Sequence, residues 1–500
     1  MFFRVFPMPL AALWWVVVFG CASSSDPAGD FRNPGGGRDL ERSSDRVIDL
    51  PATSAPPEGR VLLVSVTGLV PDFYVASDGR NALMPTLTEL AEDGVWVERL
   101  EPAVPASTYP SHATLVTGRY PASHGITGDQ LLGDTGVRST PPWHASRLRG
   151  PSLWQAATAA DKEVIALGWP TTLGAAISLL VPDVYPTRRG ENWIDLVGAG
   201  TTPWLLERLR ARMPKGAGSD WPDLPERDSL VVDLACDASR LADPPDLWLL
   251  RLVAPMGPLW RDGPDTLSMR RSLARVDAEL DRLLTCLNQA GILEEMSVVV
   301  VGDQAWQPVH TRIEANVALR LAGLIARDPR MDTGVRSWKA IVRSNGGSAF
   351  VYAKDEPSAL LARDVLEKES KESGVFRVVP ASEMSARGAD PEAWFGLAAR
   401  PGYVFGNAVR GSRLLVVSPV RAVGGYFESS PGSEVGLVGW GSGLRRGVTI
   451  PVMPAIDLAP TLATLLGISL DETDGRPFVG ALSFDPDLEK NLREIPQGQP

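Results

Sequence analysis

Clustered basic residues, cysteine and histidine are all scarce in this chain of 500 residues. It holds three cysteines and four histidines, its formal net charge is −11, and its isoelectric point is near 5.1. Binding of nucleic acid depends on clustered lysine and arginine side chains that neutralise phosphates, and we find no such cluster. Nucleic acid is therefore not an expected partner. The composition, 44% hydrophobic and 22% charged, is ordinary for one large α/β domain or two smaller ones.

The N-terminus lacks an apolar run long enough for a permanent transmembrane helix. One basic residue, Arg4, precedes the apolar stretch from Val5 to Gly20, which ends at Cys21. A run of this length is typical of a secretory signal segment. The residues Val18-Phe19-Gly20-Cys21 resemble a bacterial lipobox, although Phe19 replaces the small residue usual there.

We therefore expect residues 1–21 to be a lipoprotein-type signal peptide ending at Cys21. Lipid on Cys21 would anchor the protein to a membrane of the bacterial cell envelope, facing the periplasm or the exterior. A cleaved signal without lipid and a retained anchor stay open as alternatives. The other two cysteines, Cys236 and Cys286, either pair in an exported compartment or remain separate buried thiols, and their spacing does not decide between these.

Apolar periodicity is missing from residues 22–58, which are rich in serine, glycine and proline and are expected to be a flexible linker. Continuous apolar runs, typical of strands buried on both faces of a parallel sheet, alternate with helical patterns in residues 59–310. This alternation predicts an α/β fold with a doubly wound, mostly parallel sheet and helices on both faces. The predicted strands are 61–66, 164–167, 247–253 and 297–301, and the predicted helices are 85–94 and 267–290.

The pattern is less regular in residues 311–423, and we interpret this segment as an inserted α+β subdomain. Strands are predicted at 348–353 and 413–417, with a helix at 358–372 between them. Residues 424–484 are expected to return to the α/β core through a strand at 434–440 and a helix at 457–466. Residues 485–500 are expected to be a C-terminal tail.

Ligands of open α/β sheets bind outside the carboxyl ends of the strands. Thr67, Met256 and Asp303 each lie just beyond a predicted strand. We therefore expect these three residues to face one crevice.

Several segments together match one known family. They are Val61–Phe73, Met84–Gly94 and Pro105–Ile126, and further Gly263-Pro264, Val300–Gln304, Gly425-Tyr426 and Gly439–Gly467. Through them the sequence resembles the type I phosphodiesterase/nucleotide pyrophosphatase family of the alkaline phosphatase superfamily over most of residues 60–470. The resemblance implies an alkaline-phosphatase-like fold and a phosphoric diester hydrolase with two zinc ions.

The resemblance also implies the site residues. Thr108 stands at the position of the nucleophile, and Asp303 is the one family protein ligand for zinc that is retained besides it. Asp129 stands where the family has an asparagine that donates to phosphate, and a carboxylate there would repel an anion. The positions where the family has metal ligands and this chain has other residues are Thr67, Met256, Trp260, Gln304 and Gly424.

Zinc requires three or four cysteine, histidine, aspartate or glutamate ligands, so the resemblance implies a site that has lost its metals. No cofactor is expected. Without metals, Thr108 is an alcohol with no evident base, and nothing offsets the charge of a phosphoryl transition state.

The retained residues also have structural interpretations. Thr108 is expected to be a helix N-cap, Asp303 a buried hydrogen-bonded carboxylate, and His112 and His124 packing residues. Trp260 would fill the space of a lost ligand and make the pocket more apolar.

The leading hypothesis is a catalytically degenerate envelope protein that binds an unknown ligand or protein partner. The alternative is an active metal-dependent hydrolase of phosphodiesters or related esters, using Thr108 and a rearranged metal site at Asp303. His310, Asp262 and Glu428 are the candidate replacement ligands. A third hypothesis is a structural component of the envelope with a vestigial crevice.

Overall fold

The computed structural model describes residues 59–75, 82–138, 140–188, 190–213, 223–331, 333–427 and 434–484. The expected signal peptide with Cys21, the expected linker and the expected C-terminal tail lie outside the described residues. The chain divides into two units, Met1–Pro51 and Ala52–Pro500, and every described residue belongs to the second. Within the described ranges, no helix combines the length and the apolar character needed to cross a membrane.

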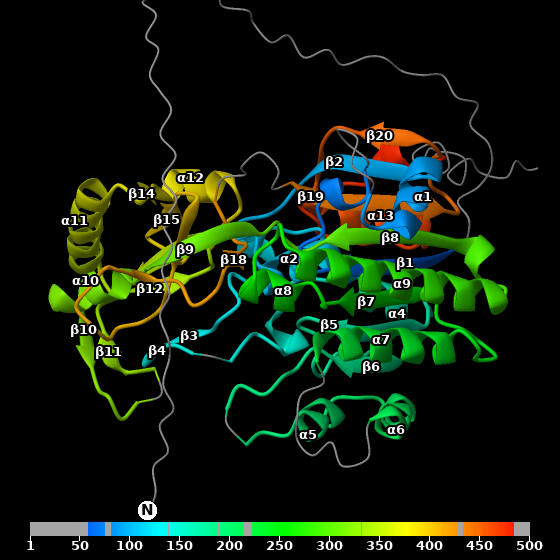
Figure 1. The fold of residues 1–500 in the computed structure, drawn as a ribbon, viewed down its shortest axis with the longest axis horizontal. Coiled ribbons are helices and arrows are strands. Elements are labelled where there is room, and N and C mark those ends of the chain that lie inside the picture. Colours follow the sequence, from blue (N-terminus) through cyan, green and yellow to red (C-terminus); the bar gives the residue numbers. More distant parts are fainter. Residues whose placement is uncertain are drawn as a thin grey trace, which may run out of the picture. The chain divides into compact units, whose positions relative to one another are not determined.

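A mixed, mostly parallel sheet of nine strands occupies the centre of the described unit (Figure 1). Its strands are β1 (Arg60–Val66), β2 (Val95–Glu101), β5 (Val164–Trp169), β6 (Leu179–Pro182), β7 (Leu247–Leu252), β8 (Met296–Gly302), β19 (Val435–Gly441), β20 (Val448–Ile450) and β21 (Met453–Pro454). They run in the order β20-β2-β19-β8-β1-β7-β5-β6, and β21 also pairs with β2. Strand β19 is antiparallel to both of its neighbours, whereas the other pairs are parallel.

The sheet is wound on both faces. Leu62 and Val64 of β1 pack into one hydrophobic core, and Val61 and Leu63 pack into the other. The helices α1 (Pro85–Asp93), α7 (Leu224–Ala238) and α9 (Leu267–Gln289) contribute to the first core. The helices α2 (Thr108–Thr117), α4 (Leu153–Ala159) and α13 (Leu458–Leu465) contribute to the second. The structure confirms the predicted doubly wound sheet.

The predicted elements of this core are confirmed with small shifts at their ends. The continuous apolar run that predicted a strand at 61–66 is buried throughout in β1. The helix predicted at 267–290 is α9, whose N-cap Thr266 accepts a hydrogen bond from the Met269 N–H. The continuous apolar run agrees with a strand covered on both faces, and the period of 3.6 agrees with a helix buried along one face.

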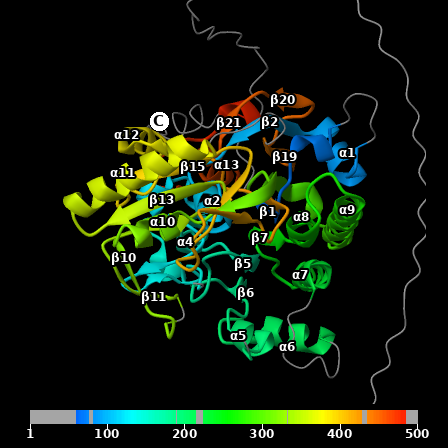
Figure 2. The same ribbon diagram turned by 60° about the vertical axis from the view of Figure 1, so that its left-hand side comes forward.

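A four-stranded antiparallel sheet with its own hydrophobic core lies beside the main sheet (Figure 2). Its strands, in spatial order, are β12 (Ala340–Ser344), β13 (Ser348–Ala353), β15 (Phe395–Ala399) and β14 (Phe376–Val379). The helices packed with them are α10 (Ala315–Leu321), α11 (Glu356–Ser373) and α12 (Ala381–Ala386). These elements fall within residues 311–423, and the boundaries of the expected subdomain remain a prediction.

Smaller sheets and helices complete the described residues. One sheet is formed by β9 (Gln307–Ile313), β16 (Gly402–Phe405), β17 (Leu415–Val417) and β18 (Ala422–Val423). Two hairpins are formed by β3 (Leu132–Gly133) with β4 (Gly136–Val137), and by β10 (Ile325–Arg327) with β11 (Val335–Trp338). The remaining α-helices are α3 (Pro121–His124), α5 (Trp193–Gly198), α6 (Pro203–Arg212) and α8 (Met256–Arg261).

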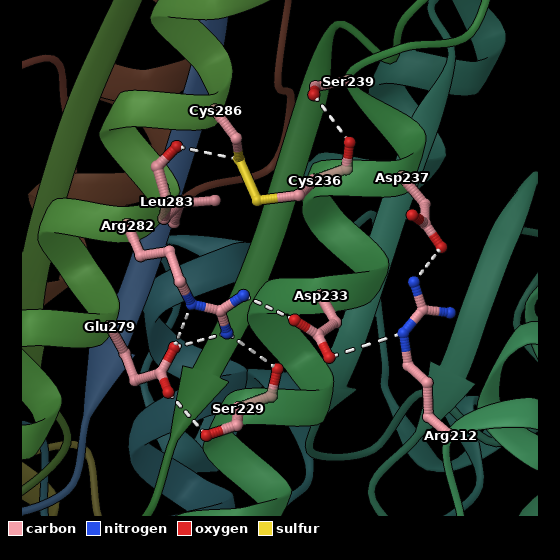
Figure 3. The surroundings of a disulfide bond; sticks show 10 residues. All are labelled: Arg212, Ser229, Asp233, Cys236, Asp237, Ser239, Glu279, Arg282, Leu283 and Cys286. Carbon is pink, nitrogen blue, oxygen red and sulfur yellow. Dashed lines mark hydrogen bonds and ion pairs between the residues drawn. A yellow bond between two sulfur atoms is a disulfide. The ribbon is translucent and has the colours of Figure 1, made fainter.

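A disulfide joins α7 to α9 through Cys236 and Cys286, which are 50 residues apart in the sequence (Figure 3). This settles the two alternatives that the sequence left open. One turn from the disulfide, Arg282 of α9 donates to Asp233 of α7 and to Glu279. The covalent link and the Arg282–Asp233 ion pair therefore hold the same two helices together.

Replacing both Cys236 and Cys286 with serine should lower the free energy of unfolding by about 4 kcal/mol, because the unfolded chain regains the entropy of a 50-residue loop. Chemical denaturation monitored by circular dichroism measures this. A reductant should lower the stability of the native protein by a similar amount and leave the double variant unchanged. Equal stability of the two proteins without reductant would contradict the prediction.

Candidate functional site

The three residues expected at one crevice lie at the same edge of the sheet. Thr67, Met256 and Asp303 follow β1, β7 and β8, which are adjacent and parallel. Asp303 Oδ1 accepts a hydrogen bond of 3.0 Å from the backbone N–H of Gly68. This bond ties the loop after β8 to the loop after β1.

A cavity of about 550 Å³ opens at this edge of the sheet. The residues that line it and carry the argument below are Thr108, Asp129, Arg251, Met256, Trp260 and Asn345. Four of them, all except Arg251 and Asn345, were singled out in the sequence. Asn345 comes from the loop between β12 and β13, so the antiparallel sheet supplies part of the wall.

Thr108 is the first residue of α2, and the expectation that it is the N-cap is wrong. Ser107 is the N-cap, with an extended backbone, but its side chain makes no capping bond. Asp129 does this instead, because its Oδ1 accepts a 2.8 Å hydrogen bond from the Tyr109 N–H. A carboxylate near the first turn interacts favourably with the helix dipole. The anion position at this helix end is therefore occupied by a side chain of the protein itself.

Burial raises the pKa of Asp129, and the hydrogen bond that it accepts from the Tyr109 N–H acts in the opposite direction. The start of α2 therefore favours the ionised form of this carboxyl group. Conversely, the N-terminus of α2 depends on Asp129 for its cap.

The Thr108 hydroxyl accepts a 3.1 Å hydrogen bond from the side-chain amide of Gln304. An amide donor does not remove a proton from an alcohol. The nearest histidine in the helix, His112, bonds to the backbone carbonyl of Thr108 at 2.7 Å and to the Ser65 hydroxyl at 2.8 Å. The geometry therefore gives Thr108 a hydrogen-bond donor where a nucleophile needs a base.

A buried arginine in the cavity lining lies between two carboxylates. Arg251 of β7 is 4% exposed, and its Nη1 lies 2.9 Å from Asp183 Oδ2. Its Nη2 lies 3.9 Å from Asp303 Oδ2. Arg227 of α7 binds the other oxygen of Asp183. Two guanidinium groups and two carboxylates therefore neutralise one another in a largely buried cluster.

The charges shift one another's pKa values. Burial raises the pKa of Asp303 to about 6, although Arg251 acts to lower it. Burial also acts to raise the pKa of Asp183, but Arg227 and Arg251 offset it and hold that pKa below its ordinary value. The pKa of Arg251 is raised, since Asp183 and Asp303 outweigh the effect of its burial. The arginine is therefore permanently charged.

Sequence reasoning missed Arg251, Asp183 and Asn345. The signal for Arg251 was its place in the otherwise apolar run Leu247-Trp-Leu-Leu-Arg-Leu-Val253, because a charge in a buried strand needs a partner. That partner, Asp183, is 68 residues away in the sequence, and nothing in the sequence identifies it.

The residues present do not fit a zinc pair. Asp303 is accompanied by Thr67, whose buried hydroxyl has no hydrogen-bond partner in the structure, and by the guanidinium of Arg251. A Cβ at Gly424 would stand 2.0 Å from Gln304 Oε1, so the Gln304 side chain fills the space next to that position. Across the described ranges, no three or more histidine, cysteine, aspartate or glutamate side chains form a group that could hold a metal ion.

The two described candidate replacement ligands, His310 and Asp262, do not join Asp303. His310 is exposed on β9, bonds to the Thr311 hydroxyl at 2.7 Å, and packs against Tyr403. Asp262 accepts a 2.7 Å hydrogen bond from Ser268. Glu428 lies outside the described residues.

Comparisons with known proteins agree with this fold. Over 266 residues the chain is 23% identical to mouse ectonucleotide pyrophosphatase/phosphodiesterase family member 1, covering 52% of this chain and 25% of that protein. It is 25% identical over 261 residues to an uncharacterized pyrophosphatase/phosphodiesterase of Schizosaccharomyces pombe, covering 50% of this chain and 45% of that protein. The chain thus spans less than half the length of these curated relatives.

Solved structures are also similar. Human ectonucleotide pyrophosphatase/phosphodiesterase 5 superimposes with a TM-score of 0.59 at 16% identity, covering 83% of this chain and 97% of that chain. An inactive form of the mouse protein in complex with AMP superimposes with a TM-score of 0.58 at 17% identity, again covering 83% and 97%. At this identity the likeness shows the fold alone. The sequence profile of one family matches residues 61–398, which is more than half of the chain. The chain therefore belongs to the type I phosphodiesterase/nucleotide pyrophosphatase family.

Proposed function

We propose that this chain is a catalytically degenerate member of its family that binds a ligand or protein partner and does not hydrolyse phosphodiesters. Lipid on Cys21 would hold it in the bacterial cell envelope, facing the periplasm or the exterior. The observation that carries the proposal is the position of Arg251 between Asp183 and Asp303. A permanent cation, Arg251, lies beside Asp303, the one carboxylate that this chain retains at a family metal-ligand position.

Electrostatics at Thr108 support the same proposal. Phosphoryl transfer requires positive charge or hydrogen-bond donors around the phosphoryl oxygens. In this chain the Asp129 carboxylate accepts from the Tyr109 N–H at the start of α2. A phosphate beside Thr108 would meet a carboxylate there, and the two negative charges repel each other.

The retained Thr108, which lines the cavity at a helix N-terminus, is the observation that favours the alternative of an active hydrolase with one metal at Asp303. That enzyme would need ligands besides Asp303. The two proposals differ in metal content and in turnover, so one experiment separates them.

The experiment measures zinc by mass spectrometry on protein purified without chelators and re-equilibrated with zinc, together with hydrolysis of a chromogenic phosphodiester. We expect much less than one zinc per chain and no turnover above that of Thr108→Ala. An active member of the family, assayed in parallel, is the positive control. Stoichiometric zinc with turnover that Thr108→Ala abolishes would overturn the proposal and establish the active hydrolase.

A further inference from the structure

A second cavity, of about 720 Å³, is lined by residues of α7, α8 and α9, three helices that pack on the same face of the main sheet (Figure 1). Its apolar lining includes Leu224, Pro258 and Ala274. Leu224 also lines the cavity beside Thr108, but no other described residue lines both. The second cavity is therefore a separate candidate site.

Arginine predominates among the charged residues of this second lining. Arg261 ends α8, while Arg271 and Arg275 lie about one turn apart on α9, and all three residues are exposed. Among the described residues, the one carboxylate in the lining is Asp223, which accepts a 2.8 Å hydrogen bond from the Glu226 N–H as the N-cap of α7. The chain as a whole carries a net charge of −11, so three cations around one carboxylate are a local reversal of charge.

The protein supplies little negative charge to balance these arginines. Within the described ranges, the Arg271 and Arg275 side chains form no hydrogen bond or ion pair. Arg261 lies 3.4 Å from Asp262, its neighbour in the sequence, and an exposed pair of this kind contributes little. Like charges four residues apart on a helix repel each other. An anion bound beside Arg271 and Arg275 would offset this repulsion.

The carboxylates nearest to Arg275 do not pair with it. Glu279, one turn further along α9, is bound by Arg282 and by the Ser229 hydroxyl. Glu226 lines an adjoining cavity together with Arg275, but the two form no ion pair. The guanidinium groups of the second cavity are therefore available to a ligand.

We propose that the second cavity binds the phosphoryl group of a phosphate monoester. A guanidinium presents its N–H groups as a planar fork that fits phosphate oxygens, and a phosphate monoester carries about two negative charges near neutral pH. It therefore matches a lining with three arginines better than a carboxylate, whose charge is smaller. The volume of the cavity leaves room for the organic part of the ester against Leu224, Pro258 and Ala274. This site goes beyond the proposed function and does not depend on it.

Phenylphosphonate and phenol test the proposal, because both carry the same ring and only the phosphonate carries a phosphoryl dianion. The carbon–phosphorus bond also resists hydrolysis. Isothermal titration calorimetry with the full chain, at about pH 8 and low salt, measures both affinities. We expect phenylphosphonate to bind at least about tenfold more tightly than phenol, and to bind more weakly as the ionic strength rises. Equal affinities, or no binding of phenylphosphonate at millimolar concentration, would overturn the proposal.

Three variants locate the binding. Arg271→Gln should weaken phenylphosphonate binding about threefold to tenfold, because it removes a charge-assisted hydrogen bond. Arg270→Gln is the matched control, since it removes the same charge from an exposed neighbour that does not line the cavity, and it should change the affinity by less than about twofold. Asp129→Asn, in the cavity beside Thr108, should leave the affinity unchanged.

Two outcomes of these variants would contradict the proposed location. Equal weakening by Arg270→Gln and Arg271→Gln would assign the effect to net charge alone. Tighter binding in Asp129→Asn would place the phosphonate beside Thr108, where removal of the carboxylate relieves repulsion.

A soluble ester and an anionic lipid share this head group. Glycerol 3-phosphate and dihexanoyl phosphatidic acid distinguish these sources, because they differ in their acyl chains. Affinities within about threefold of each other would support a soluble ester, and at least about tenfold tighter binding of the lipid would support a membrane lipid. Failure of both to bind would overturn the assignment to a phosphate monoester. Zinc-dependent turnover of a diester would contradict the proposed function alone, since it concerns the other cavity.

Discussion

Arg251→Met should lower the free energy of unfolding by roughly 3–5 kcal/mol, the usual result of removing one partner from a buried ion pair. Methionine keeps much of the length and apolar stem of arginine, so the lost charge dominates. The Asp303 carboxylate then loses the guanidinium at 3.9 Å, and Asp183 keeps Arg227 as its ion-pair partner. Chemical denaturation at neutral pH measures the effect. A decrease below about 1 kcal/mol would show that the guanidinium does not stabilise these carboxylates.

A second substitution identifies the cause. Adding Asp303→Asn to Arg251→Met removes the charge that is left unpaired, while the asparagine oxygen still accepts from the Gly68 N–H. The double variant should therefore recover at least about 1 kcal/mol relative to Arg251→Met. Arg275→Met, at an exposed position on α9, is the control and should change stability by no more than about 0.5 kcal/mol.

The same network shows what the sequence could predict about the fold. Strand β1 was predicted because its continuous apolar run matches burial on both faces, and helix α9 because its apolar residues repeat with the helical period. Residues 247–253 also predicted a strand, in spite of the charge at position 251. The partner of that charge lies in the segment after β6, and only tertiary structure brings Asp183 and Arg251 together.

Only part of the site was predicted, because some of its residues come together only in the tertiary structure. Thr67, Met256 and Asp303 were placed at one edge because parallel neighbouring strands end together. Thr108 was wrongly expected to be the N-cap, since both Ser107 and Thr108 are good capping residues and the sequence does not show that Asp129 supplies the bond. Asn345 was missed because it lies in a loop of the second sheet, 237 positions beyond Thr108.

Two buried histidines should make the protein sensitive to acid, by about 3 kcal/mol each between pH 7 and pH 4.5. Burial lowers the pKa of His112 to about 3, and Arg251 acts in the same direction. Burial also lowers the pKa of His124 to about 3, with Arg119 acting in the same direction. Below its ordinary pKa of 6.5, each histidine is protonated in the unfolded chain but stays neutral in the fold. Stability is therefore complete above pH 6.5 and is lost as the pH falls.

Carboxyl groups with raised pKa values have the opposite effect, so the readout must be a difference between proteins. Burial raises the pKa of Asp303 to about 6 and that of Asp228 to about 7, and their contribution to stability decreases as the pH rises through these values. These groups are present in both the native protein and His124→Gln, so their effect cancels. Relative to His124→Gln, the native protein should lose about 3 kcal/mol between pH 7 and pH 4.5. Urea denaturation at each pH measures this, with His144→Gln, at an exposed position, as the control. A constant difference across this range would show that His124 accepts a proton within the fold, and hence that its bonds to Thr114 and Ile126 do not hold it neutral.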